Sequence, residues 1–273
     1  MKTIIAPTDF SNVSLNAVNY AADLAAAINA ELILVNVVQI PVTVSELPLT
    51  EFEYDEMTEE AEQELAVITN QLYLRTKNKI KIHSKMVVGS VGHELEEICK
   101  RRKPFVVVMG TKGAGAAERF FIGSNTIFAV NKLEYPVLVV PQNATFKGIR
   151  KILLAFDLKE TVPAKPIEFL KQWLQIFKGR LDVINVVDSG RIKPGTLPAE
   201  IALQDLLPEF QPAFHYINGE DVEDGVYRFV EENHPNLLVI IPREHGIFSG
   251  LFHKSKSKPF ILHPHIPVLA VSE

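Results

Sequence analysis

Residues 105–113 read FVVVMGTKG, an apolar run that ends in one glycine and is followed three residues later by a second. The run from Phe105 to Met109 contains no polar residue, which is typical of a strand that is buried on both faces of a parallel sheet. Glycine lets a backbone approach an anion closely, and the N-terminus of a following helix offers free N–H groups. The stretch therefore predicts an α/β fold with a phosphate-binding loop after this strand.

The two glycines belong to a longer pattern. Gly110, Gly113, Gly123 and Ser124 form the spacing Gly-x2-Gly-x9-Gly-Ser, which occurs once in the chain. Ser124 stands where a hydroxyl can cap a helix or bind a phosphate oxygen. Loop geometry alone can explain a pair of glycines, but the full spacing after a buried strand favours a nucleotide-binding site.

Further segments around this pattern point to a known family. They are residues 4–11 (IIAPTDFS), 111–113 (TKG), 120–126 (FFIGSNT) and 135–141 (YPVLVVP). Together they resemble the universal stress protein family, as a tandem pair of domains that covers nearly the whole chain. The resemblance implies a Rossmann-like fold similar to the adenine nucleotide alpha hydrolases, with a five-stranded parallel sheet and helices on both faces in each domain. The glycine spacing matches the ATP-binding branch, although Asn125 stands where that branch often has a small apolar residue.

The resemblance also implies roles for individual residues, with ATP, with or without magnesium, as the cofactor. Asp9 would contact the ribose or adenine, the backbone at Val37 would contact the adenine, and the two glycine segments would wrap the ribose and phosphates. Asp9 can also bind magnesium or cap the first helix. The predicted site comprises Pro7, Thr8, Asp9, Val37, Met109, Gly110, Lys112, Gly113, Gly123, Ser124, Asn125 and Thr126.

The chain repeats itself at the level of its apolar runs. Residues 4–9, 34–38, 106–110 and 136–140 have counterparts, in the same order, at 152–157, 183–187, 238–242 and 267–271. Helical patterns lie between the runs, so each copy is predicted to be a doubly wound domain, one over 1–143 and the other over 148–273. The last apolar runs would leave open edges if unpaired, so they are expected to pair within the chain as a pseudo-dimer.

The second copy departs from the motif. Pro242 replaces Gly110, His245 replaces Gly113 and Lys254 replaces Gly123, although Asp157 keeps the position of Asp9. Proline removes an amide donor, so one nucleotide site per chain is predicted, in the first copy. A zinc site or an anion site in the second copy stays open, but scattered polar residues in solvated loops are the favoured explanation of both sets. The histidines are His215, His234, His245, His253, His263 and His265, and the cations are Arg243, Lys254, Lys256 and Lys258.

No catalytic group or metal site is predicted. The chain lacks the Gly-x4-Gly-Lys-Ser/Thr loop of NTPases, and no Gly-x-Gly-x-x-Gly follows the first strand. Hydrolysis is therefore expected to be slow or absent, and the predicted function is a nucleotide-responsive regulator of the stress response. The alternatives are an interaction or scaffold protein that binds no nucleotide, and a slow ATPase.

Composition limits the choice of partners and compartment. The net charge of −5 argues against nucleic acid or an acidic membrane surface as the main partner. Cys99 is the only cysteine, and no apolar run approaches the roughly 20 residues that span a bilayer. A cytoplasmic protein is expected, with an adenine nucleotide and an unidentified protein as partners; a homodimer of whole chains stays open.

Two helices are predicted near the start of the chain. Ser11 is a candidate N-cap for a helix whose apolar residues recur from Ala17 to Ile28. The acidic segment Glu51 to Glu64 has no counterpart in the second copy and is predicted to be a solvated helix, with a lid over the site as the alternative.

Overall fold

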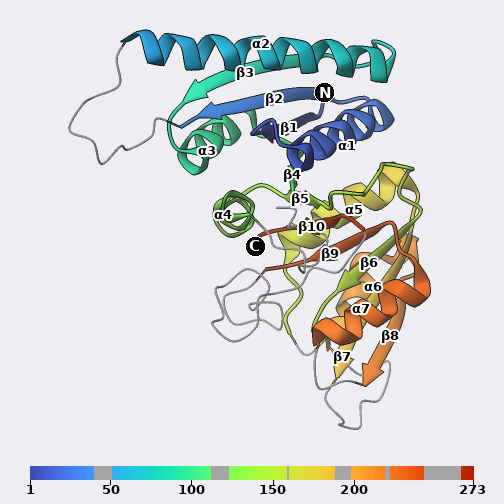
Figure 1. Ribbon diagram of the computed structural model, residues 1–273. Coiled ribbons are helices and arrows are strands. Elements are labelled where there is room, and N and C mark those ends of the chain that lie inside the picture. Colours follow the sequence, from blue (N-terminus) through green and yellow to red (C-terminus); the bar gives the residue numbers. More distant parts are fainter. Residues whose placement is uncertain (40–50, 112–122, 159, 188–197, 219–221, 243–265) are drawn as a thin grey trace, which may run out of the picture.

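The computed structural model describes residues 1–39, 51–111, 123–158, 160–187, 198–218, 222–242 and 266–273. Ten strands within these ranges form one continuous sheet with helices on both faces (Figure 1). The strands are β1 (Thr3–Thr8), β2 (Glu31–Val38), β3 (Ile82–Val88), β4 (Val106–Gly110), β5 (Val137–Val140), β6 (Lys151–Ala155), β7 (Arg180–Val187), β8 (Ala213–Asn218), β9 (Leu237–Ile240) and β10 (Val268–Ala270).

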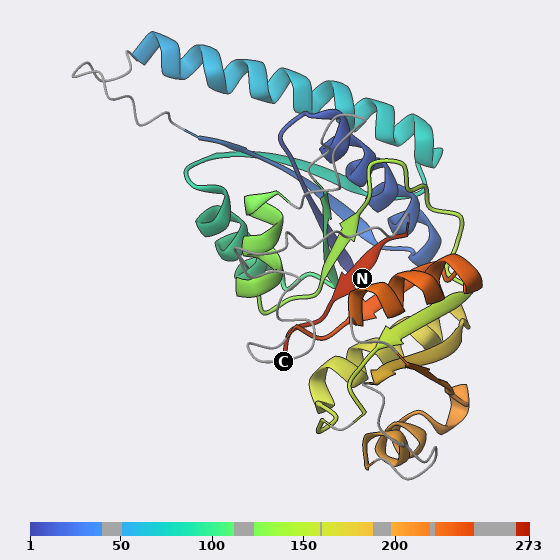
Figure 2. The same ribbon diagram turned by 60° about the horizontal axis from the view of Figure 1, so that its bottom comes forward.

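The sheet consists of two halves with the same topology. Its strand order is β3-β2-β1-β4-β5-β10-β9-β6-β7-β8, so each half repeats the order 3-2-1-4-5 of a doubly wound sheet. Within each half all strand pairs are parallel, whereas β5 and β10 pair antiparallel, with Leu138 opposite Leu269. The predicted α/β class and repeated doubly wound topology are confirmed, and the two predicted five-stranded sheets form one ten-stranded sheet (Figure 2).

Helices cover both faces of this sheet. On one face lie α1 (Asn12–Ile28), α2 (Glu51–Thr76), α5 (Ala164–Phe177) and α6 (Pro198–Leu206), and on the other lie α3 (Val91–Arg102), α4 (Ser124–Lys132) and α7 (Val222–Asn233). Each face has its own buried apolar cluster, which runs through both halves. In the described part of the chain, no helix carries an apolar stretch long enough to cross a membrane.

The first helix begins and ends where its sequence indicates. The Ser11 side chain accepts a hydrogen bond from the Ser14 N–H, as expected for an N-cap. The helix ends at Asn29, which adopts the left-handed conformation that asparagine tolerates well. Between these ends, small alanines face the sheet and let the helix pack closely against β1 and β4.

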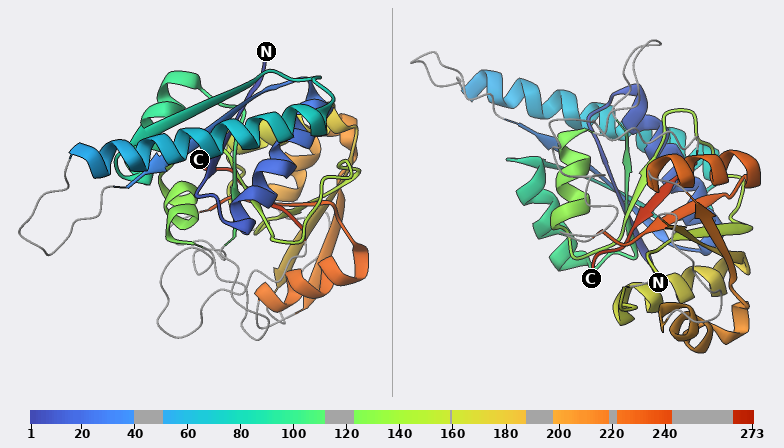
Figure 3. Two further views of the ribbon diagram at one scale, coloured as in Figure 1. Left: turned by 45° about the horizontal axis from the view of Figure 1, so that its top comes forward. Right: turned by 90° about the horizontal axis from the view of Figure 1, so that it is seen from below.

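The acidic segment forms part of α2, which continues to Thr76. Ala61, Leu65, Ile68 and Leu72 recur at helical spacing and are buried, whereas the glutamates from 56 to 64 are exposed. The prediction of a helix with a solvated acidic side is confirmed. Figure 3 shows α2 running along the outside of the sheet. The described residues that line the cavity at the carboxyl ends of β1, β2 and β4 come from other elements.

Aromatic side chains join the two halves on the face of α1 and α5. Trp173 of α5 is fully buried and stacks on Phe105, which precedes β4, with ring centroids 5.6 Å apart. Phe146, from the segment that links the halves, meets the Tyr20 ring edge-on at 5.3 Å. Asn16 of α1 also donates hydrogen bonds to the carbonyls of Pro141 and Ala144, which fixes the start of that segment.

Candidate functional site

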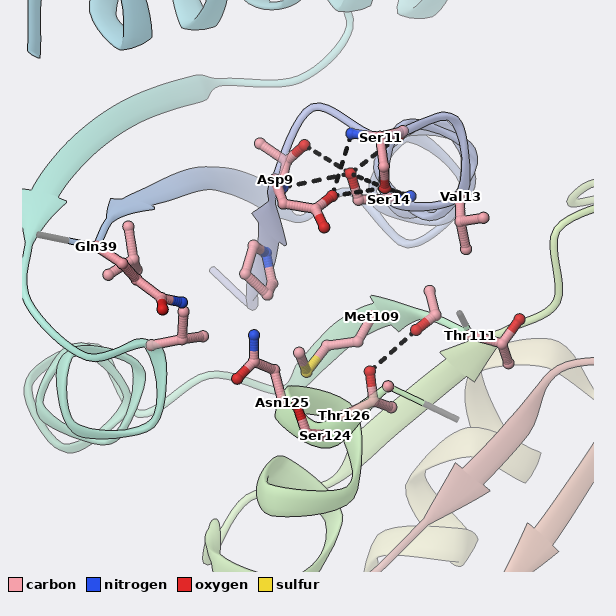
Figure 4. Close-up of a pocket in the computed structure, with 16 residues that line it drawn as sticks. Asp9, Ser11, Val13, Ser14, Gln39, Met109, Thr111, Ser124, Asn125 and Thr126 are labelled. Carbon is pink, nitrogen blue, oxygen red and sulfur yellow. Dashed lines mark hydrogen bonds between the residues drawn. The ribbon is translucent and has the colours of Figure 1, made fainter. Parts of the chain in front are cut away.

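A cavity of about 490 Å³ opens at the carboxyl ends of β1, β2 and β4 (Figure 4). The strands β2 and β3 lie on one side of β1, whereas β4 and β5 lie on the other, so the strand order reverses between β1 and β4. In doubly wound sheets, ligands bind at this reversal point because the loops after the two strands diverge and leave a crevice. The volume lies within the range of small-molecule sites.

The turn from β1 into α1 forms one wall of the cavity. Phe10 adopts a left-handed conformation with φ of 63°, which is unfavourable for a bulky residue. Two contacts hold it: the Phe10 N–H donates to Thr8 Oγ1 at 3.0 Å, and the Ser11 N–H donates to Asp9 Oδ1 at 3.1 Å. The strained turn is thus fixed by its own side chains, and it presents Asp9 to the cavity.

Asp9 is held as a carboxylate. Burial alone would raise its pKa, but hydrogen bonds from the side chains of Ser11 and Ser14 and from the backbone outweigh burial, so the pKa lies below its ordinary value. The Ser11 hydroxyl donates to Asp9 Oδ1 at 2.6 Å. The Ser11 N–H also donates to Oδ1, so both of these Ser11 bonds end on the same oxygen of the carboxylate.

The N-terminus of α4 forms the opposite wall (Figure 4). Its N-cap is Gly123, a residue that has no side chain with which to cap the helix. Of the two roles that the sequence leaves open for Ser124, capping this helix does not apply, because Ser124 is already the first helical residue. In α1, by contrast, the Ser11 hydroxyl occupies one of the terminal N–H groups. The backbone amides at the start of α4 are thus better placed to bind an anion than those of α1.

Thr126 has a structural role in this wall. Its side chain is 4% exposed, and its hydroxyl donates to the Gly110 carbonyl at 3.0 Å. This bond ties the first turn of α4 to the end of β4. Thr126 was predicted to belong to the site, and in the structure its hydroxyl hydrogen is used to position the helix terminus.

Gly110 is required by packing. A Cβ built on it would lie 2.8 Å from the backbone carbonyl oxygen of Val13 and 2.8 Å from Val13 Cγ1. The end of β4 can therefore approach the first turn of α1 only because this residue has no side chain.

We expect Gly110→Ala to lower the free energy of unfolding by about 1–3 kcal/mol, because the new methyl group must displace backbone. Urea denaturation followed by circular dichroism measures the loss. Adding Val13→Ala should recover only part of it, since the carbonyl overlap remains. An unchanged midpoint for Gly110→Ala would show that β4 and α1 are further apart in solution.

Ten of the twelve predicted site residues line the cavity, and the other two, Lys112 and Gly113, lie outside the described residues. Six further lining residues were not predicted as part of the site: Ser11, Val13, Ser14, Gln39, Val91 and Thr111. Ser11 and Ser14 follow Asp9 at the start of a helix, so their position in the sequence could have indicated that they lie beside Asp9 in the site. Gln39, just beyond β2, carries no local pattern that would reveal it.

The described lining of the cavity carries one charged side chain, that of Asp9, and it contains neither lysine nor arginine. A ligand's negative charge would therefore be met here by the amides of α4, or by a cation beside Asp9. Lys112, which belongs to the predicted site, lies outside the described residues.

The matching position in the second half differs. Phe156 stands where Thr8 stands in the first half, and its side chain is buried. Pro242 follows β9 at the position of Gly110 and has no N–H to offer. The replacements at His245 and Lys254 lie outside the described residues, as do Arg243, Lys256, Lys258, His253, His263 and His265.

The two histidines of the second copy that the structure does describe are not grouped as metal ligands. His215 Nε2 lies 2.8 Å from Asp182 Oδ1, and His234 follows the end of α7. Over the described ranges, no three His, Cys, Asp or Glu side chains are placed to share a metal ion.

Comparisons with known proteins agree with this architecture. A model of the universal stress protein family matches residues 1–141. A universal stress protein of Methanocaldococcus jannaschii is 32% identical over 142 residues, which are 51% of this chain and 81% of the relative. The crystal structure of a universal stress protein from Archaeoglobus fulgidus aligns with a TM-score of 0.76 and 18% identity, over 99% of this chain and 98% of the other. A Pseudomonas aeruginosa protein of unknown function aligns with a TM-score of 0.54 and 11% identity, over 100% and 92%.

The fold and the cavity define a doubly wound α/β protein with a crevice at its switch point. Within that class, the chain belongs to the universal stress protein family. The two structural similarities extend the shared fold over both halves.

Proposed function

We propose that this protein binds one adenine nucleotide per chain in the cavity of its N-terminal half, with ATP as the preferred nucleotide. We further propose that this binding regulates its role in the stress response. The observation that carries the proposal is the pairing of two features across one cavity: the uncapped N-terminus of α4 and the fixed carboxylate of Asp9. The first suits phosphate and the second suits ribose hydroxyls or magnesium.

The described residues fit such a ligand in a definite way. The amides of Ser124 and Asn125 would hold phosphate oxygens, and Thr126 keeps them in place through Gly110. Asp9 would hold either a ribose hydroxyl or a magnesium ion that offsets phosphate charge. The neutral side chains of Val37 and Met109 would cover the adenine.

A single site is proposed because the halves differ where the ligand would lie. We take the halves as two domains, 1–143 and 148–273. In the second, Phe156 and Pro242 replace a threonine and a glycine of the first site. Calorimetric titration with Mg-ATP should therefore saturate near one nucleotide per chain, whereas two would show that the second domain binds as well.

Asp9→Ala should weaken Mg-ATP binding by about 10–100-fold, because one charge-assisted contact is lost. Asp157→Ala is the matched control, since Asp157 holds the equivalent position in the second half and its loss should leave the affinity unchanged. Circular dichroism of both variants shows whether they are folded.

Each other outcome identifies a different function. Equal affinity of the Asp9 variant and the parent would place the nucleotide elsewhere. No binding of ATP, ADP, AMP or cyclic AMP at millimolar concentration would favour the scaffold alternative. Phosphate release above background, abolished by Asp9→Ala, would favour a slow ATPase.

A further inference from the structure

The solvent side of α2 has an uneven composition. We call the residues Glu56, Glu60, Gln63, Val67, Asn70 and Leu74 the outer face of α2. They recur every three or four residues, opposite the buried Ala61, Leu65, Ile68 and Leu72, and all six are exposed. Figure 1 shows α2 as the outermost layer of its half, with no described element beyond it.

Two large apolar residues, Val67 and Leu74, stand on the C-terminal half of the outer face. Leu74 is 78% exposed and Val67 is 56% exposed, the highest values for large apolar side chains in the described residues apart from Met1. A single exposed leucine is normal, but these two lie seven residues apart on the same side of one helix. That spacing is the repeat by which one helix packs along another.

The two ends of α2 carry opposite charge. Glu56, Glu60 and Glu64 are exposed towards the N-terminal end, and Lys77 and Lys79 are exposed in the turn that follows the C-terminal end. If Val67 of one helix lies against Leu74 of a second, antiparallel copy, Glu64 of each chain lies opposite Lys77 of the other. The surface is therefore complementary to itself about a two-fold axis near Asn70.

We propose that the outer face of α2 is the interface through which two copies of this chain associate, with their α2 helices antiparallel. The proposal does not depend on nucleotide binding. The strands β5 and β10 are already paired with each other inside the chain, so neither is a free edge for a second copy. A helix face with apolar residues on both sides of the axis and opposite charges further out offers a two-fold contact that uses no sheet edge.

Sedimentation velocity over a concentration series of the full chain tests the proposal. The parent should pass from monomer to dimer as concentration rises, and Leu74→Glu should raise the dissociation constant at least about tenfold. Ile201→Glu is the matched control, because Ile201 is also an exposed apolar residue on a helix, at 47% exposure, but lies on α6. A parent that stays monomeric, or a dimer that Leu74→Glu leaves intact, would overturn the proposal.

Charge reversal tests the antiparallel arrangement. Changing Glu60 and Glu64 to lysine should weaken the dimer, and adding Lys77→Glu and Lys79→Glu should restore it. A dimer that the second pair of changes fails to restore would exclude this orientation.

A disulfide reports the contact directly. Asn70→Cys lies next to the proposed axis and should form a cross-linked dimer under mild oxidation, whereas Gln204→Cys on α6 should not. The native Cys99 should not interfere, because it is buried and burial raises the pKa of its thiol to about 12. Equal cross-linking of both variants would contradict the proposal.

Discussion

Replacing Trp173 by alanine should lower the free energy of unfolding by about 3–5 kcal/mol. The Trp173 side chain is fully buried and lies between the halves, stacked on Phe105 and packed against Phe169 and Phe177. Alanine would leave a cavity that both halves line, and aromatic contacts are lost in addition to buried area. Urea denaturation followed by far-UV circular dichroism measures the change, since the only tryptophan is removed.

Trp173→Phe is the matched control. The Nε1 group of Trp173 is buried and has no hydrogen-bond partner among the residues that the structure describes, so phenylalanine removes an unsatisfied donor together with some packing. We expect a loss of about 1 kcal/mol or less. If alanine and phenylalanine lower stability equally, or if alanine has no effect, the aromatic cluster does not hold the halves together as the structure indicates.

Replacing Asp182 by alanine should lower the free energy of unfolding by about 3 kcal/mol at neutral pH. The side chain of Asp182 is fully buried in β7, and its Oδ1 lies 2.7 Å from Arg180 Nη2 and 2.8 Å from His215 Nε2. Lys151 Nζ lies 3.7 Å from Oδ2 and also donates to the Asn233 carbonyl at the end of α7. Removing the carboxylate therefore leaves cationic groups from β6 and β7 without their common partner.

The effect should depend on pH in one direction. Burial alone would raise the pKa of Asp182. Hydrogen bonds from His215 and Arg180, together with the positive charges of Arg180 and Lys151, lower it by more, so the folded pKa lies below that of the unfolded chain. A lowered folded pKa stabilises the protein above the unfolded pKa of about 4, and that contribution is lost as pH falls through the folded value.

The stability difference between parent and Asp182→Asn should accordingly be constant around neutral pH and shrink below about pH 4. Urea denaturation at a series of pH values provides the measurement. A difference that stays the same into strong acid would mean that the charge of Asp182 contributes nothing, and that packing alone explains the loss.

Most of the sheet could be predicted from the sequence because its central strands are continuous apolar runs. The run at 106–110 and its counterparts mark strands buried on both faces, and each became a strand of the structure. The edge strands β3 and β8 were not found this way. His83, Ser84 and Lys85 of β3 are exposed, so that strand lacks the apolar pattern of the interior.

The candidate site was predictable only where its residues are neighbours in sequence. Thr8, Asp9 and the glycines stand out beside buried strands, whereas Gln39 joins them through folding alone. Two partners of Asp182 were hidden for the same reason, since Lys151 and His215 come from the strands on either side of β7. Ser124 does not cap α4, because glycine can also occupy an N-cap and Gly123 does so one position earlier.

The antiparallel pairing of β5 with β10 has a consequence for how the two halves could diverge. Separate subunits joined through the same strand would mix freely, and a change that spoils one surface would appear in every copy of a homodimer. Here both partners of the pairing are encoded in one chain, so each molecule contains one of each in fixed proportion. The second half can therefore lose residues such as a glycine after its fourth strand while the first half keeps its own, and the pair still assembles.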